Sequence, residues 1–171
     1  MELMRNVNGK LLRCGYTTGA CAAAAAKAAG MMLLSGAPVE RVSIATPAGL
    51  TPTLAVLDPR LAAGCASCAV RKHAGDDPDV TDGALIRARV KKSAQGIVID
   101  GGKGVGRVTK PGLDQPVGAA AINSAPRGMI AQGLREAAEA YGYAGGFSVL
   151  ISVPGGGELA KRTFNPRLGI E

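Results

Sequence analysis

The chain has 171 residues, which is enough for about one domain with its own buried core. Apolar residues make up 47% of it, but it has only two Phe, three Tyr and no Trp, a composition that argues against an aromatic stacking platform for single-stranded nucleic acid. The net charge of +7 favours an anionic partner, although ordinary solubility charge explains the balance equally well.

The cysteines and the N-terminus indicate the cellular compartment in which the protein works. Four Cys and one His suit a reducing cytosol better than a disulfide scaffold. The first residues lack the apolar core of a signal peptide, and the longest apolar stretch, residues 20–34, carries Lys27 at its centre. That stretch is also shorter than the roughly 20 residues of a membrane span. We therefore expect a cytoplasmic protein without a membrane partner.

The first half of the chain predicts one helix and one hairpin. Thr17 and Thr18 precede an alanine run that reaches Leu34, so hydroxyl N-caps stand directly before residues of high helix propensity. We predict a helix over about 18–34, ended by a turn after Ser35. Residues 42–46 and 53–57 are short strand patterns around a Pro-Ala-Gly turn, which predicts a hairpin.

The second half predicts further strands and a second helix. Residues 65–70 and 85–90 are strand candidates, and in the second of them Arg87 and Arg89 alternate with apolar residues. Residues 96–99 form a short strand of the buried type. Pro126 stands near the start of a helix over about 126–141, and 147–153 is a strong last strand. The expected fold is α+β: a single domain over 1–171, with a mixed sheet packed against the two main helices.

An acidic segment over residues 74–83 holds four carboxylates in seven residues. Its spacing does not fit a calcium-binding EF-hand loop. One hypothesis is a turn whose Asp side chains cap backbone amides. The other is that Asp76, Asp77 and Asp79 face a substrate as proton acceptors or hydrogen-bond partners.

A glycine-rich loop over residues 101–106 follows the short buried strand. It is not a phosphate-binding P-loop, because Arg107 and Val108 stand where Lys and Ser or Thr are needed. Closely spaced glycines let a flat ligand or an anion approach the main chain, and seven basic residues but one acid lie between Arg87 and Lys110. A hairpin that merely tolerates glycine is the alternative.

The cysteines and the histidine give weaker signals. On a strand Cys65 and Cys68 would lie on opposite faces, which favours small buried residues over half a zinc site. Cys21, near a helix N-terminus, has either a lowered pKa or a packing role. His73 is either an acid–base residue or an incidental one. No metal site is predicted.

Five sequence blocks taken together resemble one family, the cobalt-precorrin-5B C1-methyltransferases, or CbiD family, of anaerobic cobalamin (vitamin B12) synthesis. They occur in the family's order and cover essentially the whole chain: residues 15–29, 74–83, 104–113, 121–127 and 164–170. Members of the family continue beyond the last block, so the chain resembles the N-terminal part of such an enzyme.

The resemblance implies S-adenosylmethionine as methyl donor and a cobalt corrinoid precursor as acceptor, with cobalt arriving in the substrate. A polycarboxylate macrocycle suits a basic, glycine-rich surface. His73 and Ala20 depart from the family, which usually has Asp and Ser there. No catalytic role is therefore assigned to residue 73.

The site hypothesis combines these signals, and it names no residues for the donor. Asp76, Asp77 and Asp79 are the catalytic candidates, to order the site or to remove a proton. The substrate-binding candidates are two hydroxyl residues beside the pocket, three loop glycines and three cations for the substrate carboxylates: Thr17, Thr18, Gly102, Gly104, Gly106, Arg107, Lys110 and Arg127. The alternative function is a noncatalytic anion- or corrinoid-binding domain, and a homo-oligomer is possible.

Overall fold

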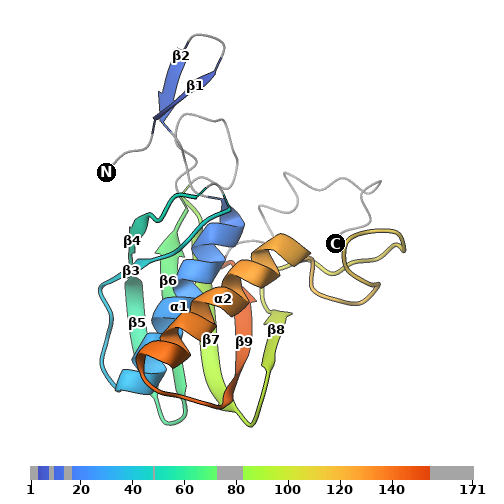
Figure 1. The fold of residues 1–171 in the computed structure, drawn as a ribbon. Coiled ribbons are helices and arrows are strands. Elements are labelled where there is room, and N and C mark those ends of the chain that lie inside the picture. The colour runs from blue at the N-terminus through green and yellow to red at the C-terminus, as the bar shows by residue number, and fades with distance from the viewer. Residues whose placement is uncertain (1–3, 8–9, 14–16, 48, 73–82, 155–171) are drawn as a thin grey trace.

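A mixed sheet with two helices on one of its faces forms the main body of the structure (Figure 1). This computed structural model describes residues 4–7, 10–13, 17–47, 49–72 and 83–154. The order across the sheet is β5-β6-β7-β9-β8, in which β8 runs parallel to β9 and all other neighbours are antiparallel. The strand bounds are β5 Leu57–Ala62, β6 Cys65–Arg71, β7 Leu85–Ser93, β8 Ile97–Gly101 and β9 Gly146–Ser152. The predicted α+β fold with a mixed sheet is confirmed.

Two short antiparallel hairpins accompany the sheet. The predicted hairpin around Pro47 is present, with strands β3 (Arg41–Ser43) and β4 (Thr53–Ala55). A second hairpin, β1 (Met4–Val7) and β2 (Lys10–Arg13), was not expected from the sequence.

Helix α1 (Thr18–Ser35) is the centre of the core, and its bounds agree with the predicted 18–34. Its alanines are buried, and because they are small the helix lies directly on β6 and β7. By length and composition this apolar helix could cross a membrane, but 61% of that window is buried inside the protein. In this fold it is a core helix.

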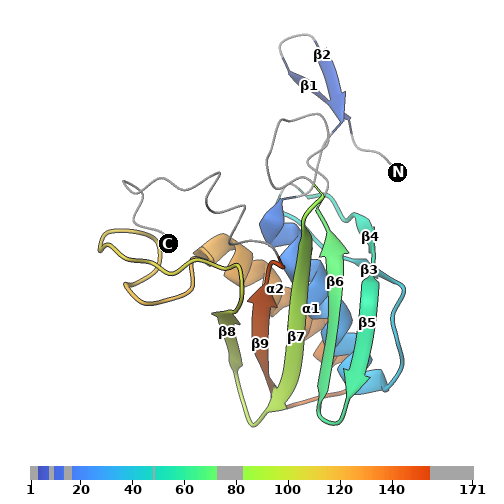
Figure 2. The same ribbon diagram turned by 180° about the vertical axis from the view of Figure 1, so that it is seen from behind.

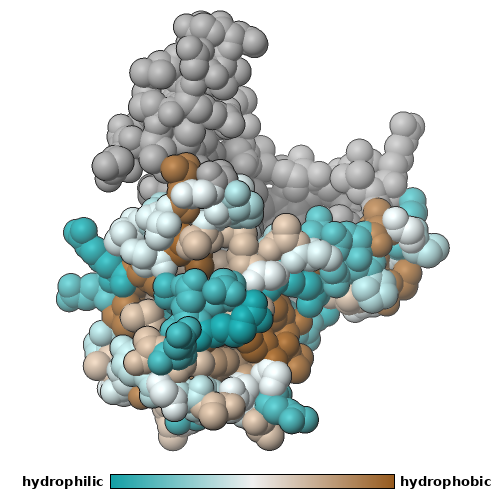
Figure 3. Space-filling view, in the orientation of Figure 1, coloured by the Kyte–Doolittle hydropathy of each residue, from teal (hydrophilic) through white to brown (hydrophobic). Residues whose placement is uncertain are grey.

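Helix α2 (Ser124–Ala140) begins two residues earlier than the predicted 126 and packs across α1. Glycines allow the close approach: a Cβ on Gly30 would lie 2.8 Å from Leu134 Cδ2. Lys27 Nζ donates to Glu136 Oε2 (2.7 Å) and to the Ser43 carbonyl (2.8 Å), which ties α1 to α2 and β3. The outward surface along α2 is mostly hydrophilic (Figure 3).

The two faces of the sheet differ as the sequence predicted. The apolar residues of β7, among them Ile86 and Val90, point to the helices, whereas Arg87 alternates with them on the face without helices (Figure 2). The thiol of Cys68 donates to the Ala25 carbonyl of α1 (3.2 Å). Cys65 Sγ instead accepts a hydrogen bond from Arg89 (3.0 Å), so the two thiols lie on opposite faces.

Two strands differ from expectation. β8 is an edge strand and not a buried one, because it pairs only with β9, and Val98 is 63% exposed. β5 was not predicted, because it begins Leu-Asp-Pro-Arg, without apolar alternation, and Asp58 adopts a positive φ of 45°. Both edges of the sheet were therefore harder to predict than its centre.

Candidate functional site

Several chain segments that are distant in sequence meet at one end of the sheet, the upper end in Figure 1. The register pairs Arg71 with Leu85, Arg87 with Ser152 and Gly101 with Ile151, so β6, β8 and β9 all end where β7 begins. Both helices also begin there. This topology brings together described residues from three of the five blocks that carry the family resemblance, 15–29, 104–113 and 121–127. Block 74–83 is described only at Gly83, and block 164–170 lies outside the described residues.

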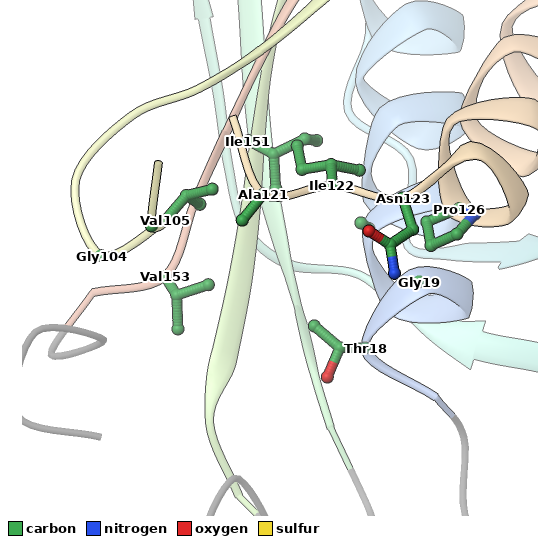
Figure 4. Close-up of a pocket in the computed structure, with 12 residues that line it drawn as sticks. Thr18, Gly19, Gly104, Val105, Ala121, Ile122, Asn123, Pro126, Ile151 and Val153 are labelled. Atoms are coloured by element: carbon green, nitrogen blue, oxygen red, sulfur yellow. The ribbon is translucent and has the colours of Figure 1, made fainter. Parts of the chain in front are cut away.

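A pocket of about 320 Å³ lies at this end (Figure 4). It is formed by the first turns of both helices, the glycine loop, the segment before α2 and the end of β9. Its lining residues are Thr18, Gly19, Ala22, Gly104, Val105, Gly106, Ala121, Ile122, Asn123, Pro126, Ile151 and Val153. None of these side chains is ionisable.

Glycines determine how closely the walls of the pocket approach each other. A Cβ on Gly19 would lie 3.0 Å from Pro126 Cβ, so the first turns of the two helices touch only because residue 19 has no side chain. A Cβ on Gly101 would lie 2.9 Å from Ala120 Cβ, so this glycine lets β8 reach the segment before α2. Gly104 has a φ of +80°, a backbone conformation that favours glycine at the turn of the loop.

The N-terminus of α2 is capped from outside the helix. Asp114 Oδ1 accepts from the Ser124 backbone N–H (3.0 Å) and hydroxyl (2.6 Å), and the Ser124 hydrogen bonds lower the pKa of the carboxyl. Asn123, at the N-cap position, makes no side-chain capping bond. Its amide faces the pocket instead (Figure 4).

The predicted hydroxyl and glycine residues divide into two groups. Thr17 Oγ1 accepts from the Ala20 N–H (3.0 Å), which confirms it as the N-cap of α1. Thr18, Gly104 and Gly106 line the pocket. Gly102 is not among the lining residues: its N–H donates to the Ile151 carbonyl (2.7 Å).

The predicted cations lie around the pocket but do not line it. The Arg107 guanidinium donates to Asp100 Oδ1 and to the Gly101 carbonyl, each at 2.7 Å, and lowers the pKa of Asp100. Lys110 is exposed in the loop that follows. These two residues stay predictions as ligands for substrate carboxylates.

Arg127 has a structural environment that the sequence did not reveal. Its side chain is half-buried and donates to the backbone carbonyls of Ile122 (2.6 Å), Ala120 (3.1 Å) and Ile99 (3.1 Å). Arg127 thus joins the segment before α2 to β8. Its role in substrate binding also stays a prediction.

The catalytic candidates Asp76, Asp77 and Asp79, together with His73, lie outside the described residues. The two ends of their segment are described. The Lys72 N–H donates to the Ala84 carbonyl (2.8 Å) and the Gly83 N–H to the Lys72 carbonyl (2.7 Å). These bonds close the base of the segment at the end of β6, which is the end of the sheet that carries the pocket.

The buried thiols are not activated. Burial raises the pKa of Cys21 to about 11 and that of Cys68 to about 12. The packing role of Cys21 is therefore correct and the lowered pKa is wrong, because desolvation of the thiolate outweighs the helix N-terminus. Within the part of the chain that the structure describes, no three His, Cys, Asp or Glu side chains are grouped to hold a metal ion.

Sequence reasoning gave no role to several lining residues. Ala121, Ile122 and Asn123 belong to a block that carried the resemblance, so a signal was present, but spacing alone assigned them no chemistry. Ile151 and Val153 had only a strand pattern. Their place in the pocket depends on the pairing of β9 with its neighbours.

The fold and site together define a class of protein: an α+β domain whose two helices begin beside a small pocket, with no ionisable side chain among the lining residues that the structure describes. Comparison with known proteins gives the family. Residues 5–171 match the CbiD family, and the chain belongs to it.

Three relatives illustrate the similarity. The cobalt-precorrin-5B C(1)-methyltransferase of Ruminiclostridium cellulolyticum is 56% identical over 163 residues, which are 95% of this chain and 42% of the relative. The enzyme of the same name from Geobacillus kaustophilus is 52% identical over 94% of this chain and 44% of its own length. The crystal structure of the cobalamin biosynthesis protein CbiD from Archaeoglobus fulgidus superposes with a TM-score of 0.71 at 33% identity, over 99% of this chain and 53% of that one. The chain thus spans less than half the length of the two enzymes.

Proposed function

We propose that this chain is the N-terminal portion of an S-adenosylmethionine-dependent methyltransferase that methylates C1 of cobalt-precorrin-5B in cobalamin biosynthesis. The main support is its 56% identity, over nearly its whole length, to an enzyme of that name. The geometry agrees with this, because three of the five sequence blocks, 15–29, 104–113 and 121–127, contribute lining residues to the pocket. The proposal includes a cytoplasmic location and a small-molecule partner, with neither nucleic acid nor a membrane as partner.

The proposed reaction depends mainly on positioning. A methyl group moves from the donor sulfonium to a ring carbon once the two are held in line, and holding reactants in this way lowers a barrier without a strong acid or base. In the proposal Arg107 and Lys110 bind peripheral carboxylates of the corrinoid, and Asp76, Asp77 and Asp79 order the site or remove a proton. The Arg107 side chain is 43% exposed, and a substrate carboxylate would compete for its guanidinium with Asp100 and the Gly101 carbonyl.

Titration calorimetry of the chain with a polycarboxylate cobalt corrinoid tests this function. We expect binding that weakens at high salt, and we expect Arg107→Glu to weaken it by about tenfold or more, because a repulsion replaces an attraction. The matched control is Arg135→Glu, on the exposed face of α2. If Arg107→Glu and Arg135→Glu have equal effects, the substrate role of Arg107 is wrong.

The second candidate function is a noncatalytic corrinoid- or anion-binding domain. It is favoured by the cations around the pocket, among them Arg107 and Lys110, together with the absence of an acid or base among the lining residues that the structure describes. Only the first candidate function predicts methyl transfer. Labelled methyl should pass from S-adenosylmethionine to the corrinoid when this chain is mixed with the remaining portion of the Ruminiclostridium enzyme, and Asp77→Asn should slow that transfer without unfolding the chain. Corrinoid binding without any transfer would favour the second candidate.

A further inference from the structure

We propose that the pocket at the start of α1 and α2 binds a neutral, flat, nucleoside-type group. The apolar side chains of the pocket lie against the faces of an adenine ring, and the Asn123 amide lies at the edge of that ring. This inference rests on the proposed function, in which S-adenosylmethionine carries such a group. It assigns to the donor a place that the sequence hypothesis left open.

The size of the pocket suits a ligand smaller than the corrinoid. Small-molecule sites generally measure about 300–1,000 Å³, and this one, at about 320 Å³, is at the lower limit. A tetrapyrrole macrocycle with its side chains would not be enclosed by such a volume. One ring system with an attached sugar is the scale of ligand that the space suits.

The lining chemistry points to a neutral group. None of the lining residues that the structure describes has a charged side chain, so these residues provide no ion pair for a carboxylate or a phosphate. Val105 and Val153 stand on one side of the space, and Asn123 and Thr18 stand on the other together with the apolar residues Ile122 and Pro126 (Figure 4). An aromatic heterocycle has apolar faces and a polar edge, which suits a mainly apolar lining that carries two polar side chains.

The Asn123 amide is suited to the edge of adenine. An Asn side chain has both a donor and an acceptor, and it pairs in bidentate fashion with the amino group and ring nitrogen on one edge of adenine. Asp114 caps α2 by binding Ser124, so Asn123 is not required for capping. Gly104 and Gly106 border the same space and let a flat ring approach the main chain.

Calorimetry with adenosine, inosine and S-adenosylmethionine tests the assignment. We expect the chain to bind adenosine and S-adenosylmethionine, and to bind inosine about tenfold more weakly, because inosine lacks the amino group that Asn123 would accept from. Asn123→Ala should weaken adenosine binding and remove the preference over inosine. Absence of adenosine binding by the folded chain, or an unchanged preference in Asn123→Ala, overturns the proposal.

A pair of bulky substitutions distinguishes the pocket from its surroundings. Ala121→Leu fills the pocket and should reduce adenosine affinity by more than tenfold, whereas Ala119→Leu, two residues away and not among the lining residues, should leave it unchanged. Circular dichroism and thermal unfolding establish that both variants fold. If Ala121→Leu abolishes corrinoid binding and leaves adenosine binding intact, the pocket belongs to the acceptor and the proposal is wrong.

The same titrations separate this inference from the proposed function. Corrinoid binding without adenosine binding overturns the pocket assignment and leaves the proposed function standing. Adenosine binding that depends on Asn123, without corrinoid binding or methyl transfer, supports the pocket assignment and contradicts the proposed acceptor.

Discussion

The two ends of the sheet are both rich in glycine, but glycine has opposite structural effects at the two ends. At the pocket end, glycines at positions 19 and 101 bring walls together around a space of about 320 Å³. At the other end, the lower end in Figure 1, Gly146 packs directly against the backbone of Gln95 and Gly96 and leaves no space. The same residue type thus produces a ligand site at one end and a closed backbone contact at the other.

Aromatic residues mark the closed end. The rings of Tyr143 and Phe147 lie 5.1 Å apart, and Lys92 Nζ lies 5.5 Å from the centre of the Tyr143 ring. The Tyr143 hydroxyl lies within donating distance of two carbonyls, that of Gly146 (2.8 Å) and that of Ser93 (3.2 Å). Among the lining residues of the pocket that the structure describes, by contrast, none is aromatic. The closed end should therefore contribute to stability, and the pocket end to binding.

The largest loss of folding stability is expected from Gly146→Ala at the closed end. The added Cβ would overlap backbone atoms of Gln95 and Gly96, which cannot rotate away as a side chain can. We expect a loss of about 3 kcal/mol or more in the free energy of unfolding, at the upper end for overpacking. Chemical denaturation measures it. The control is Gly128→Ala, an exposed helical position with no atom within 4 Å of the added Cβ, which should stabilise the chain by about 0.5–1 kcal/mol. Equal stability of the two variants would contradict the closed-end description.

The second-largest loss of folding stability is expected from Arg127→Met at the pocket end. The substitution removes the donor to three backbone carbonyls, those of Ile99, Ala120 and Ile122. We expect a loss of about 1–3 kcal/mol and weaker ligand binding in the pocket. Arg127→Lys, which cannot reach all three carbonyls, should recover only part of the binding. If Arg127→Met lowers corrinoid affinity but leaves stability unchanged, Arg127 is a substrate ligand and not a structural residue.

Tyr143→Phe is expected to have a smaller effect. It keeps the ring beside Phe147 and removes the hydroxyl that donates to the Gly146 or Ser93 carbonyl. A loss of about 1 kcal/mol in the free energy of unfolding is expected, with no change in adenosine or corrinoid affinity. Altered binding in this variant would show that the two ends are coupled.

The smallest effect is expected from Lys27→Met, midway between the two ends. The hydrogen bond from Lys27 lowers the folded-state pKa of Glu136 below its ordinary value of 4.5. The ion pair therefore stabilises the fold above that pH, and this contribution is lost as the pH falls through the lowered pKa. Because the pair is partly exposed, we expect Lys27→Met to cost less than about 1 kcal/mol. The melting temperature of the Lys27→Met variant should also fall less steeply than that of the wild type as the pH is lowered. Arg135→Met, on the exposed face of α2, is the control and should keep the wild-type pH profile.

Much of the fold could be predicted from local patterns. The alanine run after Thr17 and the alternation in β7 identified a helix and a strand, because capping and periodicity act over a few residues. The edge strands β5 and β8 were missed or misjudged. Their burial depends on which strand lies beside them, and local sequence does not carry that information.

The candidate site was predicted in part. Thr18, Gly104 and Gly106 were expected near a ligand, and they do line the pocket. The site hypothesis gave Arg107, Lys110 and Arg127 the same role, the binding of substrate carboxylates. The structure distinguishes them, because Arg127 is half-buried against backbone carbonyls whereas Arg107 is paired with exposed Asp100.

The sequence alone therefore determined the helices, the central strands and the family to which the chain belongs, because these depend on short-range propensities and on the order of sequence blocks. Only the tertiary structure decided which blocks meet and what lies between them. The pairing of β8 and β9 brings Ile151 beside the glycine loop, and Asp114 caps α2 in place of Asn123. These are long-range contacts, and no periodicity within the chain specifies them.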